Sequence, residues 1–274
     1  MKNILEIFNL KNKNAVIVGG AGILGSTIAI GLGRAGAKIS ICDISDTNEI
    51  IKRIKEEKIT GKGYYIDVMD KVKINQCKEK ILQDFENIDI LVNAAGGNIK
   101  EATTSKDNSF FNLELSALEK VVRLNLFGGA ILPSQIFGEV MTGNINGGSI
   151  INISSMNAIR PLTCIPGYSA AKAAVSNFTQ WLAVHFAQEY NKKVRVNAIA
   201  PGFFLTKQNH YLLFNENGVL NKRGKSIILH TPMREFGKPD DIIGACIWLA
   251  SEASRFVTGT VIPIDGGFNA YSGV

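Results

Sequence analysis

The sequence predicts an α/β fold: a doubly wound sheet of about seven parallel strands with helices on both faces. Short apolar runs rich in Val and Ile alternate with longer segments of helical apolar spacing along the 274 residues. A glycine-rich turn separates the first such run from the first helical segment. No internal repeat, linker or low-complexity tract interrupts the alternation, so we expect one domain over residues 1–274.

The expected strands are short apolar runs, as is typical of strands buried on both faces of a sheet. In chain order they are residues 15–18, 38–42, 63–66, 88–92, 149–153, 194–199 and 260–264. Connections between such strands are right-handed almost without exception.

The helical segments carry apolar residues on one face, as do Leu24, Ile28 and Leu32 in the first. In chain order they are residues 24–35, 48–57, 71–85, 115–141, 167–189 and 240–250. Pro133 is expected to kink or break the fourth, because proline removes a helical hydrogen bond. Asn, Gly and Lys interrupt residues 203–231, which are expected to be an irregular substrate loop.

Composition and charge exclude several classes of protein. The net charge is +6, but the lysines alternate with acidic residues instead of clustering, which argues against a nucleic-acid partner. The four cysteines form no CxxC pair and no metal-ligand spacing, so we expect free thiols and no metal site. No apolar run is long enough to span a membrane, and Glu6 breaks the only apolar stretch near the start. We therefore expect a cytoplasmic protein without a membrane partner.

A glycine-rich turn follows the first strand and predicts a dinucleotide site. Gly20, Gly22 and Gly25 fit G-x-G-x-x-G, with Gly19 before them and Ile23 and Leu24 opening the next helix. Glycines let backbone N–H groups approach a pyrophosphate at the N-terminus of that helix. A plain turn between strand and helix is the alternative.

Asp43 ends the second strand and favours NAD over NADP. A carboxylate there accepts hydrogen bonds from the adenosine ribose hydroxyls and repels a 2′-phosphate. The alternative is a cap for the following helix, a role that Asp46 or Thr47 can fill instead.

Tyr168, Lys172 and Ser155 form a candidate catalytic set. Tyr168 and Lys172 lie four residues apart and share one face of a helix. A nearby ammonium lowers the pKa of a phenol, which can then act as general acid or base. Ser155 follows the fifth strand, where its hydroxyl can stabilise a developing oxyanion. Asn125 lies in an apolar helical stretch and is either part of this set or a core amide bonded to backbone.

These residues, with others along the whole chain, resemble the short-chain dehydrogenase/reductase family. The further marks are Asp67, the run from Asn93 to Gly96, Pro201 and Gly202 with Thr206, and residues 265–267 (Asp-Gly-Gly). The spacing from Tyr168 usual in that family selects Ser155 over Ser154. Two positions depart from its pattern, since Ile23 stands where the family has glycine and Val18 where it has threonine.

The resemblance implies a Rossmann-type fold and a role for each matching residue. Ser155 would polarise a carbonyl, Tyr168 would transfer the proton, and Lys172 would tune Tyr168 and bind the nicotinamide ribose. Asn125 would position a water beside Lys172. The other implied cofactor contacts are Asp67, Val68, Asn93, Ala94, Ala95, Gly96, Pro201, Gly202, Phe204 and Thr206. Family members are mostly homotetramers, paired through helices that match residues 115–141 and 167–189.

A closer resemblance is to the D-mannonate oxidoreductase (fructuronate reductase) branch of this family. It rests on residues 93–98, 153–158, 176–186, 201–206 and 266–274. It implies that a sugar acid is the small-molecule substrate, with Asn98, Met156, Asn157 and Asn209 lining its site beside Ser155. A basic substrate loop, with Lys207, His210, Arg223, Lys225 and His230, suits such an anion. The alternatives are a reductase of another keto-sugar, polyol or 3-oxoacyl substrate, and a non-catalytic NAD-binding sensor.

Overall fold

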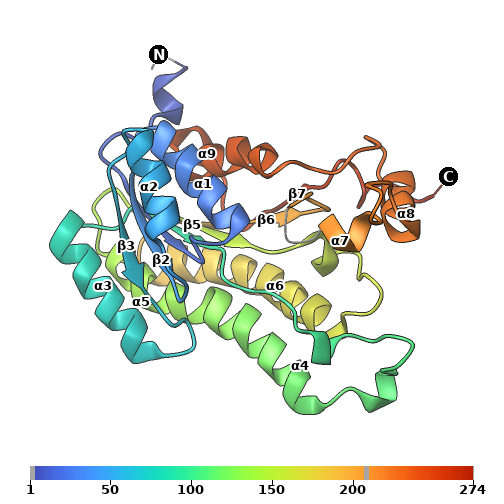
Figure 1. Cartoon of the computed structure of the whole chain (residues 1–274). Helices are drawn as coiled ribbons and strands as arrows, with labels where there is room; N and C mark the ends of the chain where they lie inside the picture. Colours follow the sequence, from blue (N-terminus) through green and yellow to red (C-terminus); the bar gives the residue numbers. More distant parts are fainter. Residues whose placement is uncertain (1–3, 207–209, 274) are drawn as a thin grey trace.

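A computed structural model of the chain describes residues 4–206 and 210–273. Its centre is a seven-stranded sheet, all parallel, in the order β3-β2-β1-β4-β5-β6-β7 (Figure 1). The strands are β1 (Asn14–Val18), β2 (Lys38–Asp43), β3 (Gly61–Tyr65), β4 (Ile90–Asn93), β5 (Gly148–Ile153), β6 (Val194–Pro201) and β7 (Val261–Ile264). The predicted fold class is confirmed.

Helices cover both faces of the sheet because its central strands are apolar on both sides. In β1, Ile17 packs into one core and its neighbours Val16 and Val18 into the other. The first core lies under α1 (Ile23–Arg34), α2 (Asn48–Glu56) and α9 (Ile243–Ala250). The second lies under α3 (Lys71–Phe85), α5 (Leu132–Thr142) and α6 (Pro166–Glu189).

The helix predicted over residues 115–141 is divided at two places. Helix α4 (Leu115–Val122) passes into a π-helical stretch, η4 (Arg123–Ile131), and α5 begins directly after it. Pro133 lies in the first turn of α5, so the second division falls next to the proline, where we expected one. The first division, at Arg123, lies ten residues earlier along the chain and was not predicted.

The prediction that residues 203–231 are irregular was wrong. The described part of this segment contains α7 (His210–Leu213) and α8 (Lys222–His230). The Asn221 side chain caps α8 by accepting the Gly224 N–H at 2.9 Å, and it also donates to the carbonyl oxygen of Leu212 at 3.0 Å. The substrate segment is thus a helical hairpin beyond the carboxyl edge of the sheet (Figure 1).

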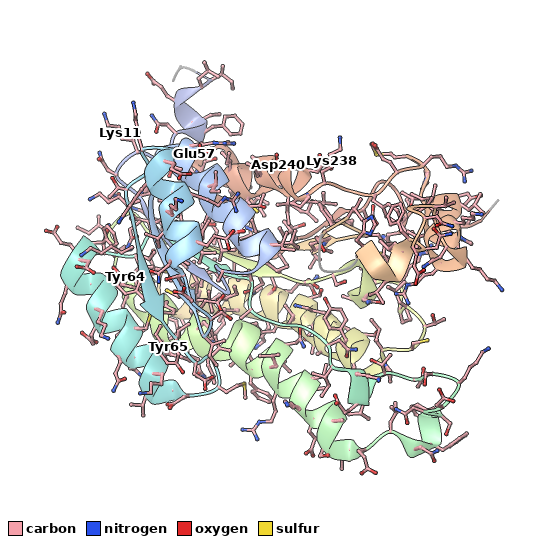
Figure 2. All side chains as sticks on the ribbon, viewed as in Figure 1. Lys11, Glu57, Tyr64, Tyr65, Lys238 and Asp240 are labelled. Atoms are coloured by element: carbon pink, nitrogen blue, oxygen red, sulfur yellow. The ribbon has the colours of Figure 1, made fainter. Side chains whose placement is uncertain are left out.

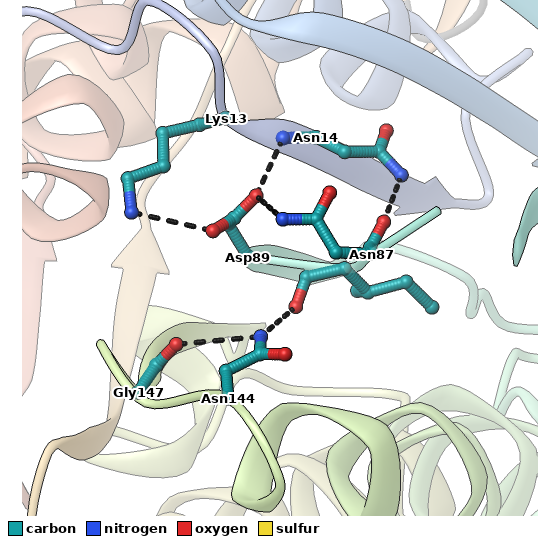
Figure 3. A network of polar contacts seen from close by, with 7 residues as sticks. Lys13, Asn14, Asn87, Asp89, Asn144 and Gly147 are labelled. Carbon is teal, nitrogen blue, oxygen red and sulfur yellow. Dashed lines mark hydrogen bonds and ion pairs between the residues drawn. The ribbon is translucent and has the colours of Figure 1, made fainter. Parts of the chain in front are cut away.

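The opposite, amino edge of the sheet is fixed by a buried polar network (Figure 3). Asp89, only 7% exposed, accepts hydrogen bonds from the Asn14 N–H at 2.9 Å, the Asn87 amide at 3.0 Å and the Lys13 ammonium at 3.2 Å. Asn144, just before β5, donates to the carbonyl oxygen of Ile88 at 2.8 Å. The network joins the starts of β1, β4 and β5 far from the carboxyl edge.

Two adjacent tyrosines on the edge strand differ in their exposure. At the sheet edge, Tyr64 and Tyr65 of β3 are adjacent in sequence (Figure 2), but the first is 7% and the second 59% exposed.

The four cysteines are free, with the Cys42 and Cys77 sulfurs 3.6 Å apart in the core. Within the described residues, no helix is long and apolar enough to cross a membrane, and no group of acidic, histidine and cysteine side chains could hold a metal ion.

Candidate active site

The glycine-rich turn lies at the carboxyl end of β1, beside β4 and β2. Gly19 has a φ of +79°, and a Cβ there would lie 2.5 Å from the Ala95 nitrogen. Its own N–H donates to the carbonyl oxygen of Cys42 at 2.8 Å. A Cβ on Gly25 would overlap the Gly19 carbonyl oxygen, so α1 starts directly against the turn. Gly20 and Gly22 complete the turn, and Ile23 and Leu24 begin α1, whose N-terminus faces this edge.

The Asp43 carboxylate is bound to the glycine turn. One carboxylate oxygen accepts the Ala21 N–H at 2.9 Å, and the other accepts the Ser45 N–H at 2.9 Å. The side chain is half-buried, so each oxygen keeps a lone pair toward the space beside the turn. This arrangement fits the two hydroxyls of an adenosine ribose, and the closely packed glycines leave room for a pyrophosphate.

The strand ends on either side of the turn complete this cradle. Asp67 and Val68 follow β3, and the Asp67 carboxylate accepts the Met69 N–H at 2.9 Å. Ala94, Ala95 and Gly96 follow β4, and the first two lie against Gly19. Asn93 is different: it is fully buried and donates to Asn152 at 2.8 Å and to Ser134 at 3.1 Å. Its side chain therefore supports the sheet beneath the site instead of reaching a cofactor.

Ser155 and Ser154 face opposite ways after β5. The Ser154 hydroxyl is 2% exposed and bonds to α6, at 3.1 Å from the Lys172 carbonyl oxygen and 2.7 Å from the Ser176 hydroxyl. The Ser155 hydroxyl hydrogen-bonds to Tyr168 and accepts the Asn157 N–H at 3.2 Å. The structure therefore brings Ser155, and not Ser154, to the tyrosine.

Tyr168 and Lys172 are neighbours on the first turns of α6. The Lys172 ammonium lies 5.7 Å from the centre of the Tyr168 ring and donates to the carbonyl oxygen of Ile153 at 2.7 Å. Burial lowers the pKa of Lys172 to about 8. Burial also raises the pKa of Tyr168, an effect that the hydrogen bond with Ser155 opposes. In the free protein the phenol therefore carries its proton, ready for donation.

Asn125 lies within the π-helical stretch η4, fully buried beside this pair. Its amide nitrogen donates to the carbonyl oxygens of Gly97 at 2.6 Å and Val121 at 2.8 Å, and its oxygen accepts the Gly97 N–H at 3.1 Å. A Cβ on Gly96 would lie 2.5 Å from the Asn125 oxygen and 3.4 Å from the Lys172 ammonium. Asn125 thus ties the loop after β4 to α4 through bonds to backbone.

Residues that the sequence analysis missed hold the tyrosine ring. Tyr168 packs on a small cluster whose buried members are Ala102, Ala117 and Val121, with Leu118 and Ile99 at its margin. Their only sequence signal is the apolar spacing of α4, which is shared by every amphipathic helix. Because the ring is packed on carbon, its hydroxyl keeps a constant direction toward Ser155.

A cavity of about 240 Å³ opens above these groups. It is lined by Ser155 and Tyr168 on one side and by Pro201, Gly202, Phe203, Phe204 and Thr206 on the other, with Leu24 of α1 at its base. Catalytic and cofactor candidates from four separate segments therefore meet in one space.

The residues proposed for substrate binding are not all placed in this cavity. Met156 and Asn157 are 1% and 4% exposed, and the Asn157 oxygen accepts the Leu162 N–H at 2.7 Å. Asn98 is exposed, and its amide donates to the Thr103 hydroxyl at 2.8 Å. Asn209 lies outside the described residues. Of the four members that the structure describes, only Ser155 lines this cavity.

The lowered pKa of Lys172 predicts a pH limit for carbonyl reduction. If Tyr168 donates its proton to a carbonyl, as the resemblance implies, a phenolate remains, which the Lys172 cation would stabilise only while the lysine stays protonated. Turnover in the reducing direction should therefore fall as pH rises through about 8. Steady-state kcat for reduction across this range checks it, with circular dichroism at each pH as the control for folding. A profile that stays flat well above pH 8 would contradict it.

The chain is similar to known oxidoreductases over nearly its whole length. The family profile described as enoyl-(acyl carrier protein) reductase matches residues 20–269. An oxidoreductase of uncharacterised activity from Bacillus subtilis, UxuB, is 46% identical over 97% of this chain and 98% of its own. A 2-dehydro-3-deoxy-D-gluconate 5-dehydrogenase from Dickeya dadantii is 33% identical over 97% of this chain and 99% of its own.

Two solved structures are similar throughout. A provisional D-mannonate oxidoreductase from Haemophilus influenza, crystallised with NAD, matches with a TM-score of 0.92 and 42% identity over 99% of this chain and all of its own. A gluconate 5-dehydrogenase from Burkholderia cenocepacia, in complex with NADP and tartrate, matches with a TM-score of 0.84 and 29% identity over 98% of this chain and all of its own.

Proposed function

The chain belongs to the short-chain dehydrogenase/reductase family of nicotinamide-dependent oxidoreductases, and we propose that it interconverts D-fructuronate and D-mannonate with NAD as its cofactor. The observation that carries the chemistry is the meeting of Ser155, Tyr168 and Lys172 at one cavity beside the glycine turn. The sugar-acid substrate is supported by relatives whose names specify gluconate derivatives and mannonate.

The residues would divide the reaction as follows. Gly19 to Gly25, Asp43 and the segment from Pro201 to Thr206 would hold the cofactor, whose nicotinamide supplies the hydride in reduction and accepts it in oxidation. The Ser155 hydroxyl would donate to the carbonyl oxygen as negative charge develops there. The Tyr168 hydroxyl would give its proton to that oxygen, and Lys172 would stabilise the phenolate that remains.

The test is a substrate panel followed at the nicotinamide absorbance. D-fructuronate should be reduced with NADH, and D-mannonate oxidised with NAD, more efficiently than other sugar acids, neutral polyols or a 3-oxoacyl thioester. The thioester is included because the matching family profile is described by an acyl-carrier-protein substrate. Faster turnover of the thioester or of a neutral polyol would refute the sugar-acid proposal. A homotetramer and a cytoplasmic location stay predictions.

The proposed preference for NAD depends on Asp43, and this dependence gives a second prediction. Its carboxylate should repel the 2′-phosphate of NADPH, since a like charge brought close costs several kcal/mol. The wild-type kcat/KM should favour NADH by roughly 100-fold or more. Asp43→Asn keeps one acceptor oxygen but removes the charge, so the ratio should shrink by about 10-fold or more. Equal efficiency of the wild-type enzyme with both cofactors would contradict the assignment.

A further inference from the structure

A second cavity lies beside the catalytic one and shares a wall with it. Its volume is about 500 Å³, and Phe203, which also lines the catalytic cavity, stands between the two. Leu162 and Thr163, which follow the catalytic serine along the chain, form one side. Helix α8 forms the other side, and the two cavities adjoin at Phe203.

The lining of the second cavity is cationic on its α8 side. Lys222, Arg223 and His230 face it, together with the Ser226 hydroxyl, and none of its lining residues is acidic. Across the described residues, neither Lys222 nor Arg223 has an ion-pair partner. An arginine fork without a carboxylate in the protein is suited to receive one from a ligand, in two parallel hydrogen bonds.

His230 supplies a different contact. Its Nδ1 lies 2.8 Å from the carbonyl oxygen of Ser226. A carbonyl only accepts, so Nδ1 must carry the hydrogen, and in the neutral ring Nε2 is left as an acceptor. A neutral His230 is therefore suited to accept a hydrogen bond from a hydroxyl, which a polyhydroxylated acid has along its chain.

The walls opposite α8 are held in place by bonds within the protein. The side-chain oxygen of the buried Asn157 accepts the Leu162 N–H at 2.7 Å and so holds Leu162 in place. Phe268 belongs to a turn in which Asp265 accepts the N–H groups of Gly267 at 2.9 Å and Asn269 at 2.8 Å. Arg160 donates to the carbonyl oxygen of Asn269 at 2.8 Å and so joins this turn to the segment after Ser155. The cavity thus has fixed apolar walls and one exposed cationic face.

We propose that Arg223, assisted by Lys222, binds the substrate carboxylate, and that α8 thereby selects anionic substrates from neutral sugars. The inference rests on the proposed function, because a hexuronate reacting at its keto group has its carboxylate at the far end of the carbon chain. Among the described residues, those that line the catalytic cavity offer hydroxyls for the carbonyl but no cationic side chain. The charge recognition is therefore assigned to the neighbouring space.

The test compares Arg223→Ala with Arg255→Ala, which removes the same charged side chain from an exposed position outside the cavity lining. Two substrates are used: D-fructuronate and D-fructose, the ketose with CH₂OH in place of the carboxylate. Arg223→Ala should raise the KM for D-fructuronate by roughly 10- to 100-fold with little change in kcat, since the lost contact is to a part that does not react. Arg223→Lys should recover part of this loss.

The controls separate charge recognition from a structural effect. Arg255→Ala should leave the kinetics with both substrates unchanged, and Arg223→Ala should change neither the KM for NADH nor the turnover of D-fructose. An unchanged KM for D-fructuronate in Arg223→Ala, or equal losses with both substrates, would overturn the inference while the proposed function stands. A wild-type enzyme that turns over no sugar acid would overturn both.

Discussion

Tyr168→Phe is expected to lower turnover by about 1,000-fold or more while cofactor binding survives. The substitution removes only the hydroxyl, which is the proton donor that hydrogen-bonds to Ser155. The ring stays in place, because it packs on carbon atoms around Ala102 and Leu118. The measurement is kcat in both directions, with NADH affinity determined by fluorescence titration.

Tyr65→Phe is the matched control for that variant. Tyr65 lies on the edge strand β3, is 59% exposed and is far from the cavity, so the same loss of one hydroxyl should leave kcat within about twofold. Full activity of Tyr168→Phe would exclude Tyr168 as the proton donor. Loss of cofactor binding together with turnover would instead show that the variant had disturbed the site as a whole.

Gly25→Ala is expected to weaken NADH binding by roughly 10-fold or more and to lower the free energy of unfolding. A Cβ at this position overlaps the Gly19 carbonyl oxygen and lies 3.0 Å from the Gly20 Cα, both of them backbone atoms. Helix α1 must therefore shift away from the turn, which misdirects the N–H groups that face the pyrophosphate. Titration with NADH and thermal unfolding measure the two effects.

Gly244→Ala makes the same substitution in α9, where a new Cβ meets nothing within 4 Å. Alanine favours a helix over glycine, so this variant should be as stable as the wild type or more stable by up to about 1 kcal/mol. Similar NADH affinity in Gly25→Ala and Gly244→Ala would show that α1 does not need to approach the turn so closely.

The strands and the cofactor turn could be predicted because their signals are local. Buried parallel strands are short apolar runs, and all seven were predicted with ends within two residues of those observed. The segment from Phe203 to Thr231 was less predictable, since its two helices are short and are fixed by contacts such as Asn221 with Leu212. The π-helical stretch around Asn125 has no distinctive sequence period at all.

The direction in which a polar side chain points was also difficult to predict from the sequence. Ser154 and Ser155 were distinguished by a resemblance in spacing, and the structure supplies the physical reason, since Ser154 bonds to α6. For Asn157 a resemblance implied a place in the substrate site, but an amide after a strand can face a ligand or a nearby N–H, and here it holds Leu162. Only the folded chain shows which partner an amide has found.

The polar network around Asp89 has a practical consequence for redesign. It joins β1, β4 and β5 at the amino edge of the sheet, opposite the candidate site, through hydrogen bonds between residues up to 76 positions apart in the sequence. The described residues of α7 and α8 take no part in this network. We therefore expect that loops and helices at the carboxyl edge can be exchanged between relatives to change substrate specificity. The sheet should tolerate such exchanges because its amino edge is held by this network.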